Sequence, residues 1–321
     1  MPKSPDFWKN RGLKSTILIP ISKIYQRISN IRRKLTKPYK ASIPVICVGN
    51  ATLGGAGKTP FVILLVEVLK HYGKNPCIIS RGYKGELKQN ILVNSQHSAK
   101  KVGDEPLLLA KYAPCIIGKN RRKSAQMASD MGADVIIMDD GLQNPSLAKN
   151  LCFLMIDGGY GFGNNRVFPA GSLREPLPNA LAKVQASVLV GKDECAILHQ
   201  LPKQLPLIRA QMIITADTQK VVAFCGIARP QKFYDSLQQA NFNIAQTFDF
   251  ADHHHFTETE LQKIKQAALS QNCIIVTTEK DYVRLSPEWQ QQITTIPAKM
   301  LINNNEILLE LLYRHHIIDK G

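Results

Sequence analysis

Residues 45–69 combine three kinds of sequence, and their order limits the fold more than any other part of the chain. The β-branched run 45–48 leads into the glycine-rich loop 49–57, and an apolar helical pattern then extends to Leu69. This order predicts a strand, a phosphate-binding loop and a helix, because the loop N–H groups converge on phosphate oxygens and the helix N-terminus adds its positive dipole end. The predicted nucleotide-binding residues are Thr52, Leu53, Gly54, Gly55, Ala56, Gly57, Lys58 and Thr59.

Lys58 and Thr59 carry the chemistry expected of such a loop. Lys58 is expected to reach the β- and γ-phosphates of a nucleotide, and the hydroxyl of Thr59 to bind Mg²⁺. The loop departs from the strict Walker A pattern, which has Gly where this chain has Thr52. Gly54 and Gly55 can supply the backbone freedom that is needed, and the simpler alternative is an ordinary glycine turn before a helix.

A second phosphate-related pattern lies downstream, where the apolar run 135–138 ends in Asp139 and Asp140. A buried strand that ends in Asp places a carboxylate beside the phosphate loop, where it can hold Mg²⁺ or its waters. Two adjacent acids can also simply start a turn. The pattern indicates a magnesium site here because a predicted phosphate-binding loop precedes it.

Strands and helices alternate along most of the chain. Apolar runs predict strands of one parallel sheet at 43–49, 76–80, 114–117, 134–139, 151–156 and 186–190, the last of which closes the sheet. We expect a P-loop kinase core at 41–215, in which 158–176 contains a long surface loop. A second βα series begins near Lys220, so residues 216–321 are expected to form a smaller domain. The predicted fold class is α/β: a P-loop NTPase-like parallel sheet, a second, smaller α/β domain and an N-terminal amphipathic helical segment.

Residues 1–40 hold most of the excess positive charge, with eleven Lys or Arg residues and one acid in a chain whose net charge is +16. Isoleucines recur at three- and four-residue steps from Ile17 to Leu35, which predicts a helix with one apolar face. A basic amphipathic helix preceded by aromatic residues, here Phe7 and Trp8, is typical of membrane surfaces. The alternative is a helix packed on the core with a solvated basic face. No run of about 18 apolar residues is present, and the run 17–21 is too short for a signal peptide.

The cysteines and histidines do not form a pattern typical of structural metal sites. Seven Cys lie mostly in apolar runs with no Cys-x-x-Cys pair, which favours a reduced core. Three adjacent histidines, 253–255, cannot all face one metal on a regular element. A hydroxyl that attacks a phosphoryl group needs a positioned base, and we expect Asp104 to be that base with a His holding it. His315 and His316 are expected at a solvated helix end.

Several short motifs together resemble the tetraacyldisaccharide 4′-kinase family of lipid A biosynthesis, and they occur in the family's order between about residues 7 and 285. They are Gly49-Asn50, Gly54–Pro60, Ser80–Tyr83, Gly103–Pro106, Asp139–Gln143, Pro169–Pro176, Asp252-His253 and Thr278–Asp281. The Phe7-Trp8 start and the helix predicted at 20–33 also resemble the membrane-binding N-terminus of that family.

This resemblance implies ATP- and Mg²⁺-dependent phosphorylation of the 4′-hydroxyl of a tetraacylated glucosamine disaccharide 1-phosphate. It implies a peripheral enzyme on the cytoplasmic face of the inner membrane of a Gram-negative bacterium. The expected partners are the glycolipid substrate in the membrane and an anionic membrane surface bound through residues 1–40. We expect a monomer and no nucleic-acid partner.

The resemblance also implies roles for single residues. Asp104 would accept the hydroxyl proton, His253 would pair with it, and Lys58 would keep its place on the phosphates. Thr59, Glu105 and Asp139 would bind the metal, although the division of roles between Asp139 and Asp140 stays open. The residues implied near substrate or phosphates are Asn50, Arg81, Tyr83, Arg121, Asp140, Gln143 and Arg174.

Two positions depart from the family pattern. Asn144 stands where the family often has His, and Ser172 stands where it commonly has Pro. The first departure puts any role of that side chain in doubt, whereas the second indicates only a change within a loop.

Three other classes of protein share some of these features. A membrane-associated GTPase would read guanine with Asn-Lys-x-Asp, whereas residues 278–281 are Thr-Glu-Lys-Asp. A dimeric deviant-Walker ATPase would have Lys in place of Leu53. A nucleic-acid binder would need aromatics interleaved with its cations, but the basic stretch carries a regular apolar face and has only Phe7, Trp8 and Tyr25.

Overall fold

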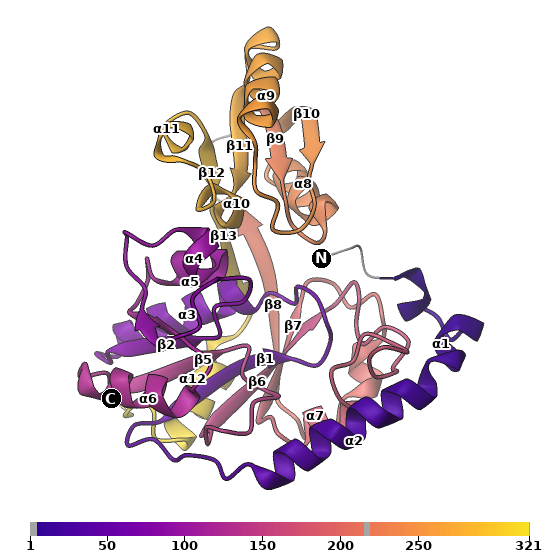
Figure 1. Ribbon diagram of the computed structural model, residues 1–321, viewed down its shortest axis with the longest axis vertical. Coiled ribbons are helices and arrows are strands. Elements are labelled where there is room, and N and C mark those ends of the chain that lie inside the picture. The colour runs from indigo at the N-terminus through magenta and orange to yellow at the C-terminus, as the bar shows by residue number, and fades with distance from the viewer. Residues whose placement is uncertain (1–4, 215–218, 321) are drawn as a thin grey trace.

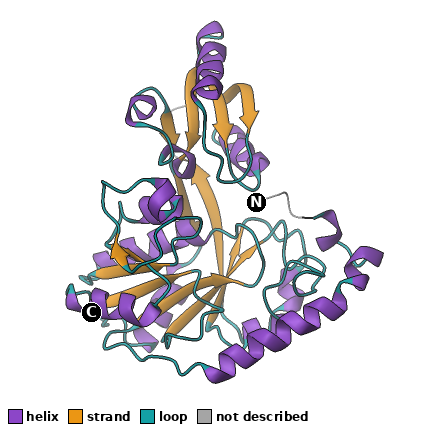
Figure 2. Cartoon of the chain, viewed as in Figure 1, coloured by secondary structure: helices purple, strands orange, loops and turns teal. Residues whose placement is uncertain are grey.

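The computed structural model describes residues 5–214 and 219–320, and within these ranges the strands form one sheet of nine and one sheet of four. The larger sheet lies in the lower part of Figure 1 and the smaller sheet above it. Figure 2 shows helices on both sides of the larger sheet and a long helix along the lower edge of the molecule. The α/β fold class predicted from the sequence is confirmed.

The larger sheet has the order β13-β8-β7-β6-β1-β5-β2-β4-β3. All neighbouring pairs are parallel except the two at its edges, β13 with β8 and β3 with β4. Its central strands are buried along their whole length, as expected for a parallel sheet covered on both faces. The strands are β1 (Val45–Asn50), β2 (Pro76–Ser80), β3 (Ile91–Leu92), β4 (Cys115–Ile117), β5 (Val135–Asp139), β6 (Leu151–Asp157), β7 (Ala186–Val190), β8 (Leu207–Ile214) and β13 (Ala298–Ile302).

Alternate residues of β1 point to opposite faces of this sheet. Ile46 and Val48 pack with α3 (Lys58–His71) and α12 (Asn305–Arg314). Val45 packs with α6 (Arg121–Asp130), and Cys47 contributes to a third cluster that includes α7 (Leu177–Leu181). The phosphate loop therefore begins from a strand that is fixed on both sides.

The smaller sheet has the order β10-β9-β11-β12, and all of its strands are parallel. Helix α8 (Pro230–Gln239) packs on one face and α9 (Glu258–Ser270) on the other. Its strands are β9 (Lys220–Cys225), β10 (Asn243–Asp249), β11 (Ile274–Thr278) and β12 (Thr294–Ile296), and its short helices are α10 (Glu279–Tyr282) and α11 (Pro287–Gln290).

The end of the chain differs from the sequence expectation. The larger sheet does not close at β7, because β8 follows it and β13 pairs antiparallel with β8. Leu308, Leu311 and Leu312 of α12 then pack in the main core of the larger sheet. Residues 298–318 therefore return to the larger unit, and the smaller unit does not extend to residue 321 as expected. Short apolar segments pair equally well with either sheet on local pattern alone.

The glycine-rich stretch 158–176 is also not the surface loop that we expected. Phe162, Val167, Ala170 and Leu173 are buried, and the segment lies between the core and the N-terminal helix. Five glycines and two prolines in this stretch suggested an exposed loop, but small residues equally permit close packing.

The N-terminal segment contains η1 (Asp6–Trp8), α1 (Leu13–Ile17) and α2 (Ile19–Leu35), with α2 along the lower edge in Figure 1. The regular apolar stripe predicted from the sequence faces outward. Within it, Ile17, Ile21, Ile24, Ile28, Ile31 and Leu35 are 53–82% exposed. No helix in the described part of the chain is both long and apolar enough to cross a membrane.

Candidate active site

The phosphate loop leaves β1 at Asn50, whose side chain shapes the loop from within. Asn50 is fully buried, and its amide donates to the carbonyls of Thr52 at 2.8 Å and Gly54 at 3.1 Å. Gly57 then adopts a φ of +77° at the N-cap of α3, a left-handed conformation that favours glycine. The loop thus ends at the N-terminus of a 14-residue helix, where anions bind favourably.

A neighbouring segment braces this loop from outside. The N–H of Leu53 donates to the carbonyl of Ser172 at 2.7 Å, and the Nε of Arg174 donates to the carbonyl of Thr52 at 3.2 Å. Ser172 itself is buried and holds the loop through its backbone. The motif around residues 169–176 therefore acts first as a support for the phosphate loop.

Lys58, Arg174 and Asp140 form a charged cluster beside the loop. Asp140 accepts two hydrogen bonds from Arg174, at 2.8 and 2.9 Å, and lies 3.5 Å from Nζ of Lys58. Burial opposes ionisation, yet the charges of Lys58 and Arg174 lower the pKa of Asp140 to about 2. Asp140 is thus a carboxylate between two cations that are suited to phosphate oxygens.

Asp139 ends β5 next to β1 and is 2% exposed. Its Oδ1 has no hydrogen-bond partner among the described residues, and its Oδ2 lies 3.5 Å from the hydroxyl of Ser80. Burial, followed by the charges of Glu105 and Asp140, raises the pKa of Asp139 to about 7. A buried carboxylate oxygen that lacks a partner fits a cation-binding role.

The donor set fits Mg²⁺ held together with a nucleotide. The described residues contain no group of three or more His, Cys, Asp or Glu residues that could hold a metal by themselves. Mg²⁺ usually takes one or two carboxylates, several waters and the phosphates of its substrate, so Asp139 and the buried Thr59 are sufficient protein ligands.

Asp104 of the larger domain and His253 of the smaller domain lie next to each other. Asp104 begins α5 (Asp104–Leu109), so it lies in the first turn of a helix. His253 lies in the turn after β10, and its Nδ1 is 3.1 and 3.0 Å from the two carboxylate oxygens of Asp104. The exposed ring of Tyr83 stands edge-on to His253, with centroids 6.0 Å apart.

Two further cations at this junction were missed by the sequence reasoning. Arg284 donates through Nε to Oδ2 of Asp104 at 3.2 Å and also binds it through Nη2, while Lys280 forms an ion pair with Glu105. Burial would raise the pKa of Asp104, but the hydrogen bond with His253 and the charge of Arg284 hold it below its usual range. Lys280 belongs to the quoted motif 278–281, whereas Arg284 lies just outside it and gave no signal.

Several residues expected near the substrate have protein partners instead. The buried Arg121 donates to the carbonyls of Ser80 and Gly118, and Gln143 donates to the carbonyl of Asn50 at 3.1 Å and to Glu175 at 3.2 Å. The side chains of Arg121, Gln143 and Asn50 thus donate hydrogen bonds to backbone carbonyls at strand ends and in loops. The side chains of Arg81 and Tyr83 are exposed and therefore accessible to a ligand.

Asn144 accepts from the N–H and hydroxyl of Ser146, at 2.9 and 2.7 Å. Its amide thus closes a local turn where the family often has His.

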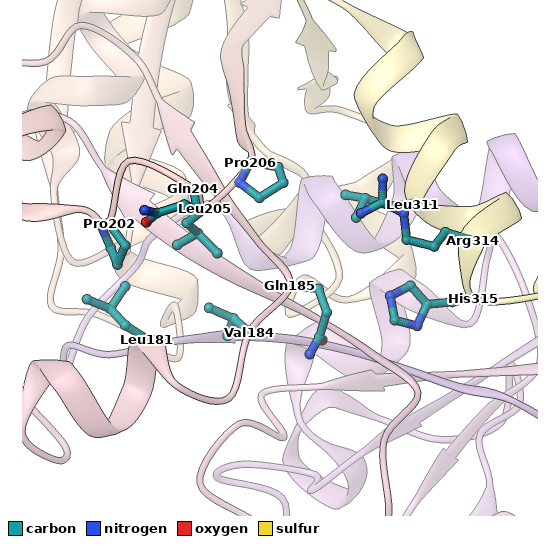
Figure 3. A pocket seen from close by; sticks show the side chains of 10 residues that line it. All are labelled: Leu181, Val184, Gln185, Pro202, Gln204, Leu205, Pro206, Leu311, Arg314 and His315. Carbon is teal, nitrogen blue, oxygen red and sulfur yellow. The ribbon is translucent and has the colours of Figure 1, made fainter.

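Two cavities lie apart from these residues. One, of about 390 Å³, is lined by Gln185, Pro206, Leu311, Arg314 and His315 among others (Figure 3). His315 is therefore half-buried beside a cavity, and the expected solvated helix end holds only for His316. A second cavity, of about 600 Å³, lies between α2 and residues 165–178.

Comparison with known proteins gives a consistent result. The family model described as tetraacyldisaccharide-1-P 4′-kinase (LpxK) matches residues 14–316. The chain is 39% identical to a tetraacyldisaccharide 4′-kinase of Rhodospirillum centenum, over 97% of this chain and 96% of that protein. It is 40% identical to one of Gluconobacter oxydans, over 97% and 98% of the two chains.

A solved structure is similar throughout. LpxK from Aquifex aeolicus, in complex with ATP, has a TM-score of 0.78 and 29% identity, and the match covers 94% of this chain and 99% of that chain.

Proposed function

This chain belongs to the tetraacyldisaccharide-1-phosphate 4′-kinase family, and we propose that Asp104, His253 and Lys58 carry out its reaction. The protein is an enzyme that phosphorylates the 4′-hydroxyl of its disaccharide substrate in lipid A biosynthesis, using ATP and Mg²⁺. The observation that most supports the residue assignment is the pairing of Asp104 with His253 at the junction with the nucleotide-binding domain.

Asp104 is the proposed acceptor of the hydroxyl proton. Its low pKa fits this role because phosphoryl transfer passes through a loose transition state, in which positioning matters more than a strong base. His253 keeps the carboxylate oriented through its Nδ1, which lies within hydrogen-bond distance of both oxygens.

Lys58, Arg174 and the N–H groups of residues 52–59 are the proposed phosphate ligands. Lys58 and Arg174 are already held near the loop by Asp140, so little reorganisation is needed when phosphate oxygens arrive. The proposed role of Asp140 is thus to position Lys58 and Arg174, and not to bind the substrate directly.

Thr59 and Asp139 are the best-supported metal ligands. When bound, Mg²⁺ supplies positive charge to the phosphate oxygens as negative charge develops on them. Glu105 is the third expected ligand, and its ion pair with Lys280 engages one oxygen of its carboxylate, Oε1. Oδ1 of Asp139 is buried and has no hydrogen-bond partner among the described residues, which is why Asp139 is placed first among the carboxylates.

Residues 5–40 are the proposed membrane-binding surface. The inner side of the N-terminal helices is held by small polar residues: Ser15 donates to the carbonyl of Ala170 at 2.5 Å and Ser22 to that of Val167 at 2.7 Å. This arrangement leaves the apolar stripe exposed, the reverse of a helix packed on a core. Exposed Lys23, Arg27, Arg32, Arg33 and Lys34 flank the stripe and would each add about 1 kcal/mol at an anionic leaflet.

The same segment connects the membrane surface with the nucleotide site. Ala170 contacts α2 through Ser22, and four residues later Arg174 contacts Asp140. A glycolipid acceptor drawn from the bilayer would therefore meet the enzyme near its phosphate loop, with exposed Arg81 and Tyr83 as further contacts. We propose a monomeric peripheral enzyme on the cytoplasmic face of the inner membrane.

Transfer of radiolabelled phosphate from ATP to the disaccharide 1-phosphate tests the assignment. Asp104→Asn should lose about 10²- to 10⁴-fold in turnover while ATP binding by calorimetry is unchanged. Glu67→Gln, an exposed change on α3, is the matched control and should keep wild-type turnover. Near wild-type transfer by Asp104→Asn would reject the proposed base.

A further inference from the structure

Arg284 is an almost fully buried cation at the junction of the two domains. Its side chain is 2% exposed and its guanidinium faces Asp104, which is 4% exposed. Nε and Nη2 both donate to Oδ2 of Asp104, the first at 3.2 Å. Nη1 donates to Oδ1 of Asp281 at 2.7 Å and to the carbonyl of Gly226 at 3.1 Å. The planar fork of arginine is suited to such a fixed geometry.

The groups behind Arg284 are themselves fixed. Asp281 is fully buried and accepts from the N–H of Gly226 at 3.0 Å and from the hydroxyl of Thr278 at 2.6 Å. The carbonyl of Gly226 also accepts from the N–H of His253 at 3.0 Å. Arg284 and His253 therefore share one rigid support in the smaller domain.

This geometry makes the two oxygens of Asp104 different. Oδ2 accepts two hydrogen bonds from Arg284 and also lies 3.0 Å from Nδ1 of His253. Among the described residues, the contact of Oδ1 is the one with Nδ1 of His253, at 3.1 Å. A carboxylate oxygen has two lone pairs, so Oδ1 is the oxygen that keeps an accepting direction for an incoming hydroxyl.

We propose that Arg284 is a positioning residue for phosphoryl transfer, which holds Asp104 through Oδ2 and so reserves Oδ1 for the acceptor hydroxyl. In the step, the 4′-oxygen bonds to the γ-phosphorus, the bond from the γ-phosphorus to the bridging oxygen breaks to release ADP, and the hydroxyl proton passes to Oδ1. The inference rests on the proposed role of Asp104. It adds that Asp104 is held in the orientation needed for transfer only when the smaller domain, which carries Arg284, is docked on the larger one.

The test compares turnover and Michaelis constants of Arg284→Lys and Arg284→Ala, each in the wild-type and the Asp104→Asn background. Arg284→Ala should lose about 10- to 100-fold in kcat, the range for loss of a hydrogen bond to a charged group, with KM values for both substrates within about twofold. Arg284→Lys should lose less, because it keeps the charge but not the fork. Guanidinium at millimolar concentration should restore part of the kcat of Arg284→Ala.

The double variants separate positioning from general damage. In the Asp104→Asn background, Arg284→Ala should change the residual kcat by less than about twofold, because the group it positions is gone. An equal loss in both backgrounds would overturn the proposal, as would wild-type kcat in Arg284→Ala. If Arg284→Ala does not fold, Arg284→Lys decides by the same comparison.

Arg229→Ala is the matched control. Arg229 is another cation of the smaller domain, and it pairs across the junction with the buried Asp157 at 2.7 Å without touching Asp104. A loss of kcat in Arg229→Ala as large as that in Arg284→Ala would assign the effect to domain docking alone and overturn the proposal. Full turnover by Asp104→Asn itself would instead reject the base assignment on which the proposal rests.

Discussion

The Nδ1 of His253 lies 3.0 Å from Oδ2 of Asp104, although 149 residues separate them in the chain. One residue opens a helix of the larger unit, and the other lies in a turn of the smaller unit with a φ of +62°. The pair therefore exists only while the two units are docked, and docking becomes part of the chemistry.

We expect His253→Ala to lower kcat by about 10- to 100-fold, because the carboxylate loses one of the groups that orient it. The KM for ATP should change little, since no contact of His253 with the phosphate loop is present among the described residues. Steady-state kinetics with both substrates varied measures this split. His255→Ala is the matched control. A rise in the KM for ATP with unchanged kcat would contradict the prediction.

Asn50→Ala should weaken ATP binding and leave the KM for the glycolipid nearly unchanged. The side chain of Asn50 donates hydrogen bonds to the carbonyls of Thr52 and Gly54. Without it, the loop conformation that binds ATP should be less stable by about 1–3 kcal/mol. Calorimetric titration with ATP, compared with kinetics on the lipid, distinguishes this effect from the direct substrate contact expected from sequence. A selective rise in the lipid KM would favour that contact instead.

The paired change Ile24→Asp and Ile28→Asp should reduce binding to anionic vesicles roughly 100-fold or more, because each isoleucine contributes about 1.5 kcal/mol or more when it leaves water. Both side chains are more than half exposed, so the fold should be retained. Co-sedimentation with vesicles is the measurement. Leu269→Asp, at a still more exposed site on α9, serves as the control. Equal binding by the paired variant and the control would reject the membrane surface.

Asp139→Asn should stabilise the metal-free protein at pH 8, stabilise it less at pH 5 and have little effect at pH 4. The pKa of Asp139 is raised from its ordinary value near 4 to about 7, so the folded state holds its proton more tightly than the unfolded state. Its contribution to stability is complete below pH 4 and is lost as the pH rises through 7. At pH 8 the free energy of unfolding of the variant should exceed that of the wild-type protein by roughly 2–4 kcal/mol.

Urea unfolding in the presence of a chelator measures that difference at each pH. Adding Mg²⁺ and ATP should stabilise the wild-type protein and have much less effect on the variant. A stability difference that is constant from pH 5 to pH 8 would contradict the assigned cause, and Asp130→Asn, an exposed change on α6, is the control.

Much of the fold and site followed from local pattern. The run from β1 through the loop to α3 is a continuous segment, so its chemistry can be read from neighbouring residues. The resemblance added His253 as the partner of Asp104, a pair that periodicity alone would not have joined. The outward direction of the Ile17–Leu35 stripe needed the structure, because an amphipathic pattern does not say which face meets the protein.

Spacing within a few turns was enough to predict a strand, a loop and a helix of the phosphate-binding type, the acids that end β5 and the two-sided character of α2. The return of β13 and α12 to the larger sheet could be seen only in the folded chain, and so could the ion pair of Arg284 with Asp104, 180 residues away. Contacts of that kind depend on how two separately folded units dock, and no short-range pattern encodes the distance between them.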